Sequence, residues 1–529
     1  MSKTIRISSS DEYISALRRK LDRDGYAKLI LLSALLSAAA AYHLLIIYGH
    51  GNADAVAEGL FMYTGADWAL ACGRWGMRYM TGAAGKVIIP GLWVTLYALC
   101  SALSAIVITR LWGLRSRMAV CLTAVLLTVN PTVIEQSLLQ YMFLAWGLSN
   151  VLSVLFVCFV FSSSRVRQFV LAPLCVAAAF GLYQSCISLM CLLFLLTLLL
   201  RLLDGEELLP LLRPLLRAAV AGLAGTGLYF LILKLELWRF HVEGSYRLAE
   251  FSLGGILTAL TDTVPQAYLG FLAYFRDPVL WRSRITASLF LIALVCGIVL
   301  LLRLIREKKL PQAVAAAVLA LLVPAAANIA DIIFFYNIPV TIMQYQTILI
   351  IPFFLALAER VWLNRPSLRN LVNIVSQLLV LALAWTYVVS ANATYLSYEL
   401  SYRRIYSDVG QALTQVYALP DYSPDEVIAF AGFPDDSTLR EQIPVYRYAY
   451  GKYNSVAFWD SLTGIQTDRR NYLLDYFGID GGYVMGMYYN QAVQSEEFRE
   501  MPVFPEAGSV RRFDGLILVK FSDAPPIID

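Results

Sequence analysis

The chain has 529 residues, of which 59% are hydrophobic and 15% are charged, and its formal net charge is +4. A membrane-spanning helix needs roughly 20 apolar residues, so a composition this apolar indicates a polytopic membrane protein. The cations lie in short gaps between apolar segments, where they predict orientation in a lipid bilayer and no nucleic-acid partner.

The first three-quarters of the chain contain about eleven apolar segments that we interpret as membrane helices. They lie near residues 27–49, 87–109, 118–139, 142–162, 168–183, 186–203, 214–235, 285–303, 311–333, 343–362 and 371–391. The first segment is too long and too far from the N-terminus for a cleaved signal peptide. Pro131, Pro173 and the polar stretch Gly181–Ser185 are expected to interrupt the segments around them.

Lys and Arg occur in every second gap between these segments. They are Arg110, Arg115 and Arg117; Arg165 and Arg167; Arg201, Arg213 and Arg217; Arg303, Arg306, Lys308 and Lys309; and Arg360, Arg365 and Arg369. The short gaps near 131–140, 181–185 and 334–342 contain neither residue type. Because cytoplasmic loops carry the excess of cations, the pattern predicts a cytoplasmic N-terminus and an external C-terminal tail.

We therefore expect an α-helical polytopic membrane protein with a small C-terminal extracytoplasmic α/β domain. The predicted parts are a cytoplasmic segment 1–26, a membrane domain 27–391 with external loops 50–86 and 236–284, and a soluble domain 392–529. Within that domain, Val427–Gly432 and Leu516–Phe521 are typical of strands, whereas Ser461–Tyr476 and Gln491–Glu500 favour helices.

The first external loop holds two acids, Asp54 and Glu58, directly after the first helix. An Asp at the membrane boundary can act as general base on a hydroxyl whose partner substrate is held in the lipid. Asp54 and Glu58 would share one helix face, and two close carboxylates raise one another's proton affinity. The alternative is that Asp54 caps a short interfacial helix and Glu58 lies on a solvated face.

The same loop continues with Asp67, Trp68, Arg74, Trp75 and Arg78. The two indoles could stack on a sugar ring or belong to the aromatic belt of the membrane interface. The two guanidiniums could bind a lipid phosphate, for which the planar fork of Arg is well suited, or form salt bridges to the loop acids. Asp67 is a second candidate acid for the chemistry.

Four further residues complete the candidate set. Glu135 is an acid at the outer edge of a helix and is either functional or a partner of a loop Arg. Tyr183 and Gln184 lie in a helix break, which survives at membrane depth only when buried or lining a wet cavity. Arg276 follows an apolar stretch that favours an interfacial helix.

No metal-ligand spacing is present, and the three His are scattered. The outer acids could hold a divalent metal, or they could be hydrogen-bonded carboxylates without one, and no other cofactor is expected.

Four short strings, in this order along the apolar segments, give the chain a family resemblance. They are Asn52-Ala53-Asp54, Ala66-Asp67-Trp68 followed by Gly73-Arg74-Trp75, and Gly181-Leu182-Tyr183-Gln184-Ser185. The chain resembles the bacterial Gtr type II glucosyltransferases, which modify O-antigen and other surface polysaccharides and belong to the GT-C type. It departs from them at Ala53, where the family often has a first acid, and at Gln344–Gln346, where a basic residue is expected.

The resemblance implies a glycosyltransferase of the bacterial inner membrane. Its donor would be a polyprenyl-phosphate-linked sugar, glucose in this family, and its acceptor a surface glycan on the outer face. An Asp general base would activate the acceptor hydroxyl, and the sugar would be transferred with inversion. The alternatives are an O-antigen polymerase or ligase, and a flippase or transporter for lipid-linked sugars.

Overall fold

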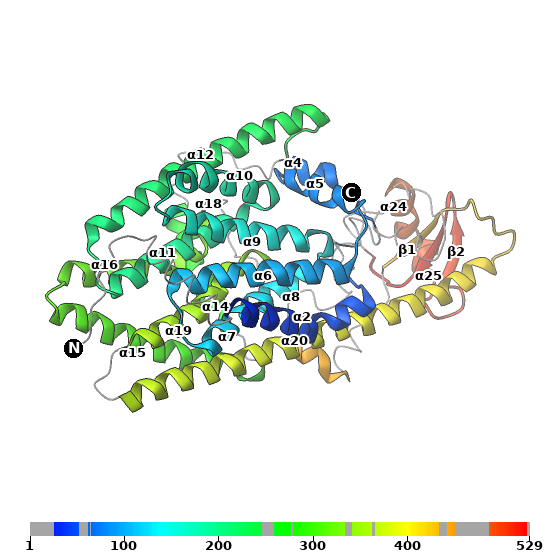
Figure 1. The fold of residues 1–529 in the computed structure, drawn as a ribbon. Coiled ribbons are helices and arrows are strands. Elements are labelled where there is room, and N and C mark those ends of the chain that lie inside the picture. The colour runs from blue at the N-terminus through cyan, green and yellow to red at the C-terminus, as the bar shows by residue number, and fades with distance from the viewer. Residues whose placement is uncertain are drawn as a thin grey trace.

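The computed structural model describes residues 26–51, 55, 62–63, 65–245, 259–276, 279–333, 341–361, 366–432, 442–449 and 486–525. It shows an elongated bundle of helices with a small sheet beyond one end (Figure 1). We call that end of the bundle the sheet end.

The first half of the bundle contains α2 (Tyr26–Tyr48), α4 (Ala66–Ala71), α5 (Trp75–Ala83), α6 (Pro90–Trp112), α7 (Arg117–Thr128), α8 (Pro131–Ser137), α9 (Gln140–Val160), η1 (Arg167–Leu171), α10 (Ala172–Leu182), η2 (Gln184–Cys186), α11 (Ile187–Leu203) and α12 (Leu208–Phe240). The second half contains η3 (Ala259–Thr263), α14 (Val264–Tyr274), η4 (Val279–Trp281), α15 (Arg282–Arg306), α16 (Leu310–Leu321), α17 (Val323–Ala327), α18 (Ile329–Ile333), η5 (Thr341–Met343), η6 (Tyr345–Leu349), α19 (Ile350–Arg360) and α20 (Pro366–Tyr417).

Each predicted apolar segment corresponds to helical structure. Eight helices of the described chain are long and apolar enough to cross a membrane, which indicates a multi-pass membrane protein. The remaining three segments are shorter or broken. Residues 168–183 form η1 and α10, 311–333 divide into α16, α17 and α18, and 343–362 form η6 and α19.

Helix α9 packs against α6 and α10 in the interior of the bundle. Gly147 permits this close approach, because a Cβ there would lie 3.0 Å from the ring of Tyr97. That ring is stacked on Phe143, with centroids 4.2 Å apart. The packing fixes the rotation of α9, and Ser149 faces α10, where its hydroxyl donates to the carbonyls of Ala179 and Tyr183.

The long helix α20 joins the membrane part to the C-terminal sheet. It has 52 residues, which corresponds to roughly 78 Å of helix. The predicted domain boundary near 392 falls inside it, because its buried face continues beyond the apolar stretch through tyrosines such as Tyr398 and Tyr402.

The sheet has the strand order β1-β3-β2, in which β1 (Ile428–Ala431) runs parallel to β3 (Leu516–Lys520) and β2 (Val510–Phe513) is antiparallel to it. This part also contains η7 (Pro444–Tyr448), α24 (Gly486–Gln494) and α25 (Glu496–Glu500). The two predicted strands are confirmed, and the helix expected at 491–500 is divided at Ser495 between the end of α24 and α25. The sequence analysis did not predict β2, and the helix expected at 461–476 lies outside the described residues.

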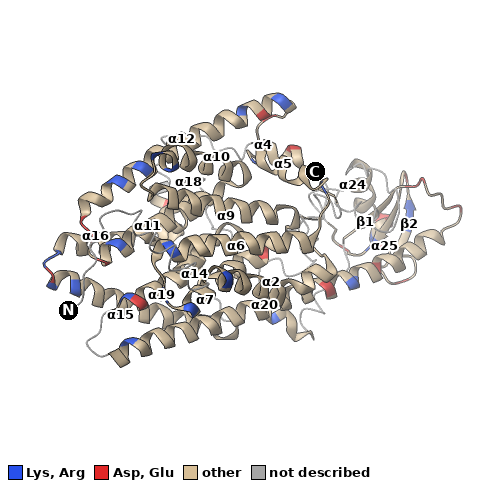
Figure 2. Cartoon of the chain, viewed as in Figure 1, with Lys and Arg blue, Asp and Glu red and all other residues tan. Residues whose placement is uncertain are grey.

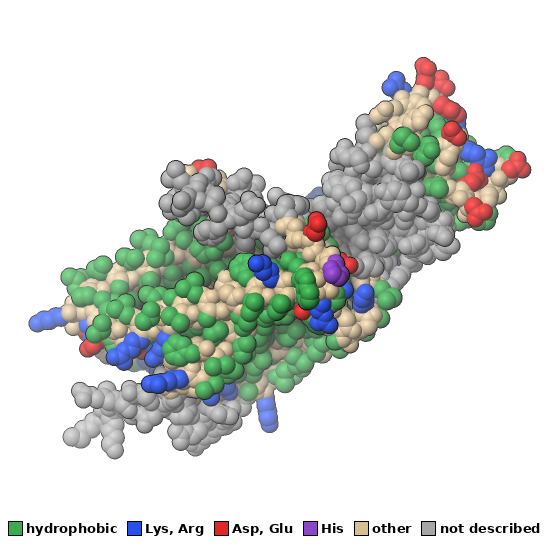
Figure 3. All heavy atoms as spheres, turned by 90° about the horizontal axis from the view of Figure 1, so that it is seen from above, with side chains coloured by type: hydrophobic (Ala, Val, Ile, Leu, Met, Phe, Trp, Pro, Cys, Tyr) green, Lys and Arg blue, Asp and Glu red, His purple; other side chains and the backbone are tan. Residues whose placement is uncertain are grey.

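Charge is distributed unevenly along the molecule. Lys and Arg gather at the end of the bundle opposite the sheet (Figure 2). Hydrophobic side chains cover much of the bundle, whereas Asp and Glu gather on the sheet domain (Figure 3). An apolar belt of this kind suits contact with lipid.

This distribution leads to a topological prediction. A cysteine introduced at the exposed position Ala507 should react with a membrane-impermeant maleimide in intact spheroplasts. A matched cysteine at the exposed Arg306, the last residue of α15, should react only after lysis, because cation-rich ends of helices face the cytoplasm. The opposite labelling pattern would contradict the predicted orientation.

Candidate functional site

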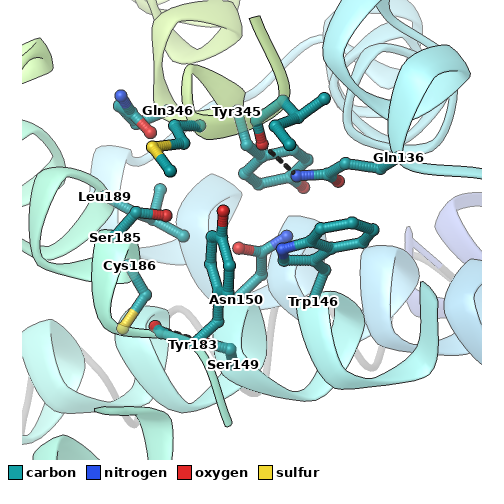
Figure 4. A pocket seen from close by; sticks show the side chains of 12 residues that line it. Gln136, Trp146, Ser149, Asn150, Tyr183, Ser185, Cys186, Leu189, Tyr345 and Gln346 are labelled. Carbon is teal, nitrogen blue, oxygen red and sulfur yellow. Dashed lines mark hydrogen bonds between the residues drawn. The ribbon is translucent and has the colours of Figure 1, made fainter. Parts of the chain in front are cut away.

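A small polar cavity lies near the sheet end, where α9 faces the break between α10 and α11. Its walls come from α8, α9, η2, α11 and the η5–η6 turn (Figure 4). The lining residues are Gln136, Trp146, Ser149, Asn150, Tyr183, Ser185, Cys186, Leu189, Ile342, Met343, Tyr345 and Gln346. The cavity volume is about 10 Å³, room for about one water molecule. A larger ligand therefore requires the walls to separate.

Three lining side chains have a buried polar atom without a hydrogen-bond partner. They are the amide oxygen Oε1 of Gln136, the indole Nε1 of Trp146 and the amide Nδ2 of Asn150. Their side chains are directed toward one another across the cavity (Figure 4). Leaving a buried polar group unpaired costs about 1–3 kcal/mol. One acceptor and two donors kept in this state are suited to a polar ligand.

The polar break between α10 and α11 brings Tyr183 into this cavity, as the sequence predicts for a helix break at membrane depth. Tyr183 has an extended backbone, and its ring lies edge-on to Trp146 with centroids 5.5 Å apart. Gly181 is required just before it, because the indole of Trp75 occupies the space where a side chain would project. Trp75 is therefore a packing residue against the break, and its Nε1 is buried without a partner.

Arg74 is the cation placed against the cavity. Its guanidinium lies over the ring of Tyr183 at 4.9 Å and points Nη1 at the sulfur of Met142, 3.7 Å away. Its Nε is buried and has no hydrogen-bond partner. Arg74 thus leaves positive charge beside the cavity without an ion pair among the described acids.

Arg78 is engaged elsewhere. Its Nη1 lies 2.5 Å from Oδ1 of Asp67, and its guanidinium lies 3.6 Å from the centre of the Phe240 ring. Asp67 is mostly exposed. For this pair, the structure matches the salt-bridge alternative.

Gln184 forms hydrogen bonds that hold the first loop, and it does not line the cavity. Its Nε2 donates to the carbonyl of Cys72 at 2.7 Å and to the hydroxyl of Tyr229 at 3.1 Å. Tyr229 in turn donates to the carbonyl of Gly73. These bonds fix the turn between α4 and α5, and therefore the position of Arg74.

Hydrogen bonds from α9 and α20 fix the start of the first loop. Gln140 donates to the carbonyls of Gly49 and His50, and Tyr402 of α20 donates to the carbonyl of Gly51. The His50 ring stacks on Tyr402, and its Nε2 lies 2.6 Å from Oε2 of Glu399. Burial lowers the pKa of His50 despite this carboxylate, so the neutral ring can donate to Glu399.

The remaining predicted residues are placed as follows. Asp54 and Glu58 lie outside the described residues, three and seven positions beyond the anchored Gly51. Glu135 is buried on α8 beside the cavity residue Gln136, whereas Trp68 and Arg276 are exposed.

No described group of three or more His, Cys, Asp or Glu is arranged to hold a metal ion.

A large apolar groove lies further from the sheet end. Its volume is about 350 Å³, and it is lined by residues of α11, α14, α15, α16, α17 and α19. It is formed largely by aliphatic and aromatic side chains, with small residues at Ala293, Gly297 and Ala316. Such a groove can accept a hydrocarbon chain.

The sequence analysis did not single out Trp146 and Asn150, which form the centre of the cavity. Asn150 gives a usable signal, because a polar residue inside an apolar span is a functional candidate. Trp146 gives none, because an indole in an apolar helix is usually a packing residue. Only the packing of α9 against α10 and α11 shows that its N–H remains unpaired.

Comparison with known proteins gives the chain a family. The family model described as glucosyl transferase GtrII matches residues 57–358, more than half of the chain. The matched region includes the cavity, Arg74 and the apolar groove, and it begins just after Asp54. No curated protein and no solved structure gave a significant match. The chain belongs to the GtrII glucosyl transferase family.

Proposed function

We propose that this protein transfers glucose from a polyprenyl-phosphate donor to a surface glycan on the outer face of the bacterial inner membrane. The family supports a glucosyltransferase acting on a surface glycan. The observation that carries the choice of donor is the shared wall of the polar cavity and the apolar groove.

Two continuous helical runs, η2–α11 and η6–α19, each contribute residues to both sites. Ser185 and Leu189 border the cavity, and Leu196, Leu199 and Leu203 further along the same helical run border the groove. On the opposite side, Tyr345 and Gln346 line the cavity, and α19 continues from there into the groove. Seven residues of α11 separate Leu189 from Leu196, a rise of about 10 Å. A molecule with a sugar head and a hydrocarbon tail fits this order.

The proposed chemistry uses residues of the first loop. The Asp54 carboxylate takes the proton of the acceptor hydroxyl, whose oxygen attacks the anomeric carbon and inverts it. The bond from that carbon to the phosphate oxygen breaks, and the lipid phosphate leaves with the electron pair. Arg74 supplies positive charge where the negative charge of the leaving group grows.

The test is transfer by membranes that contain the protein, with polyprenyl-phosphate-glucose and the native glycan. Glucose should appear on the glycan with inverted anomeric configuration, which NMR can measure. Transfer from a nucleotide sugar without the lipid would contradict the donor. Movement of preassembled glycan from a lipid diphosphate would favour a polymerase or ligase, and translocation without transfer would favour a flippase.

A side chain that fills the groove tests whether the groove binds the hydrocarbon chain of the donor. Nothing lies within 4 Å of a Cβ built at Gly297, so Gly297→Leu should fold and project into the groove. Gly222→Leu on α12 is the matched control, because it is equally unobstructed and lies outside the groove. Gly297→Leu should raise KM for a long-chain donor and leave use of a short-chain donor unchanged. Equal effects on both donors would remove the groove from the proposal.

A further inference from the structure

Asp331 is a buried acid for which the proposed function has no use so far. It lies on α18, and only 3% of its surface is exposed. Its Oδ1 is buried without a hydrogen-bond partner, and no other carboxylate oxygen of the described chain is in that state. By contrast, Glu359 accepts from the backbone N–H groups of Arg115 and Ser116, and Glu399 contacts His50.

An unpaired carboxylate oxygen in the interior is unfavourable, because burial removes water and nothing replaces its hydrogen bonds. Packing alone gives no reason for an acid at this position, since Asn or Leu would have similar size without the charge. A ligand that donates a hydrogen bond would provide the reason.

The segment that carries Asp331 is held by both walls of the polar cavity. The backbone N–H of Ala330 donates to Oγ of Ser188 at 3.0 Å, and Ser188 adjoins the cavity residue Leu189. On the other wall, Nε2 of the cavity residue Gln346 donates to the carbonyl of Ala327. Asp331 is thus one residue from a direct contact with the helix that forms the cavity wall.

The unpaired groups indicate the class of ligand. In the cavity, Trp146 and Asn150 offer donors and Gln136 offers an acceptor, and Asp331, on the segment bound to both walls, offers a second acceptor. No Lys or Arg is among the described residues that line the cavity, although Arg74 lies beside it over the ring of Tyr183. A neutral molecule rich in hydroxyls matches both kinds of group, whereas a phosphate would be repelled by the carboxylate.

We propose that Asp331 accepts a hydrogen bond from a hydroxyl of the carbohydrate bound at this cavity, and that it helps determine which sugar is used. The proposal rests on the proposed function, which places a sugar there. The hydroxyl belongs either to the donor glucose or to the acceptor glycan.

The experiment compares Asp331→Asn and Asp331→Leu with Asp262→Asn, an exposed acid on the neighbouring η3 segment. The Asp331 variants should lose about 10- to 100-fold in kcat/KM, as expected for a hydrogen bond to a charged group. Their thermal stability should be unchanged or higher, because an unpaired buried carboxylate is removed. The control should change neither property.

Substrate analogues identify the hydroxyl. A series of monodeoxy donors and acceptors should contain one analogue that reacts poorly with the wild type, and that reacts no worse than the full substrate with Asp331→Leu. Its presence in the donor or the acceptor series assigns the source. The proposal would be overturned if kcat/KM of Asp331→Asn lay within twofold of the wild-type value. It would also be overturned if the variant were less stable and this loss of stability accounted for the lost activity.

Failure of the proposed function can be distinguished from failure of the proposal for Asp331. A wild-type protein that transfers no sugar would contradict that function, and Asp331 would then be judged by the thermal shift that methyl glucoside produces. A shift present in the wild type and reduced in Asp331→Asn supports the proposal. Equal shifts in both proteins, including no shift in either, overturn it.

Discussion

Replacing Asp54 by Asn should lower glucosyl transfer about 10²- to 10⁴-fold, the usual contribution of a general base. Three residues before Asp54, the segment Gly49–Gly51 is fixed by hydrogen bonds from Gln140 and Tyr402. Loss of a helix cap would cost only about 1 kcal/mol, so the folded protein should persist.

The matched control is Asp67→Asn. Asp67 is mostly exposed and already paired with Arg78, so transfer should change only a few-fold. The measurement is initial rate at saturating donor and acceptor, with protein quantity and monodispersity checked in detergent. An Asp54→Asn protein that works within a few-fold of wild type would move the role of base to Asp67 or Glu135.

Arg74→Ala should reduce use of the lipid donor by roughly 10- to 100-fold, because charge-assisted hydrogen bonds to a phosphate are lost. The donor use of Arg74→Lys should lie between that of the wild type and that of Arg74→Ala, since Lys keeps the charge without the planar fork. The guanidinium beside Tyr183 makes no ion pair with a described acid and is available for a phosphate.

Arg239→Ala provides the control, as an exposed Arg of the same end of the bundle that contacts Tyr79. The measurement is transfer rate against donor concentration at fixed acceptor, followed by the reverse titration. If Arg74→Ala changes only the apparent affinity for the acceptor, or nothing at all, the phosphate site lies elsewhere. The loop that contains Arg276 is then the next place to examine.

The sequence predicts the helices of this fold well, because each membrane helix must satisfy its own backbone and shield it with apolar side chains. The break at Gly181–Ser185 was also predictable, since its polar residues interrupt an apolar run. The extension of α20 to Tyr417 was not, because its buried face there uses tyrosines in place of a continuous apolar stretch.

The candidate site was predictable only in part. Composition and order along the chain pointed to Arg74 and Tyr183, whose contact across the bundle the structure describes. They could not separate Arg74 from Arg78, because the partner of each guanidinium depends on how α5 packs against α10 and α12. The unpaired atoms of Trp146, Asn150 and Asp331 were likewise beyond prediction, because an absence of partners follows from all neighbours together.

The continuity of α20 has a consequence for how the C-terminal sheet can be repositioned in this protein. The same helix presents Glu399 and Tyr402 to the first loop and then carries the C-terminal sheet. Each residue of an α-helix turns it by about 100°, so one residue inserted after Tyr402 would swing the sheet around the helix axis. Seven inserted residues would complete nearly two turns and restore the facing. An insertion or a domain exchange made within this helix should therefore keep the orientation of the C-terminal part only when the angular phase of the helix is preserved.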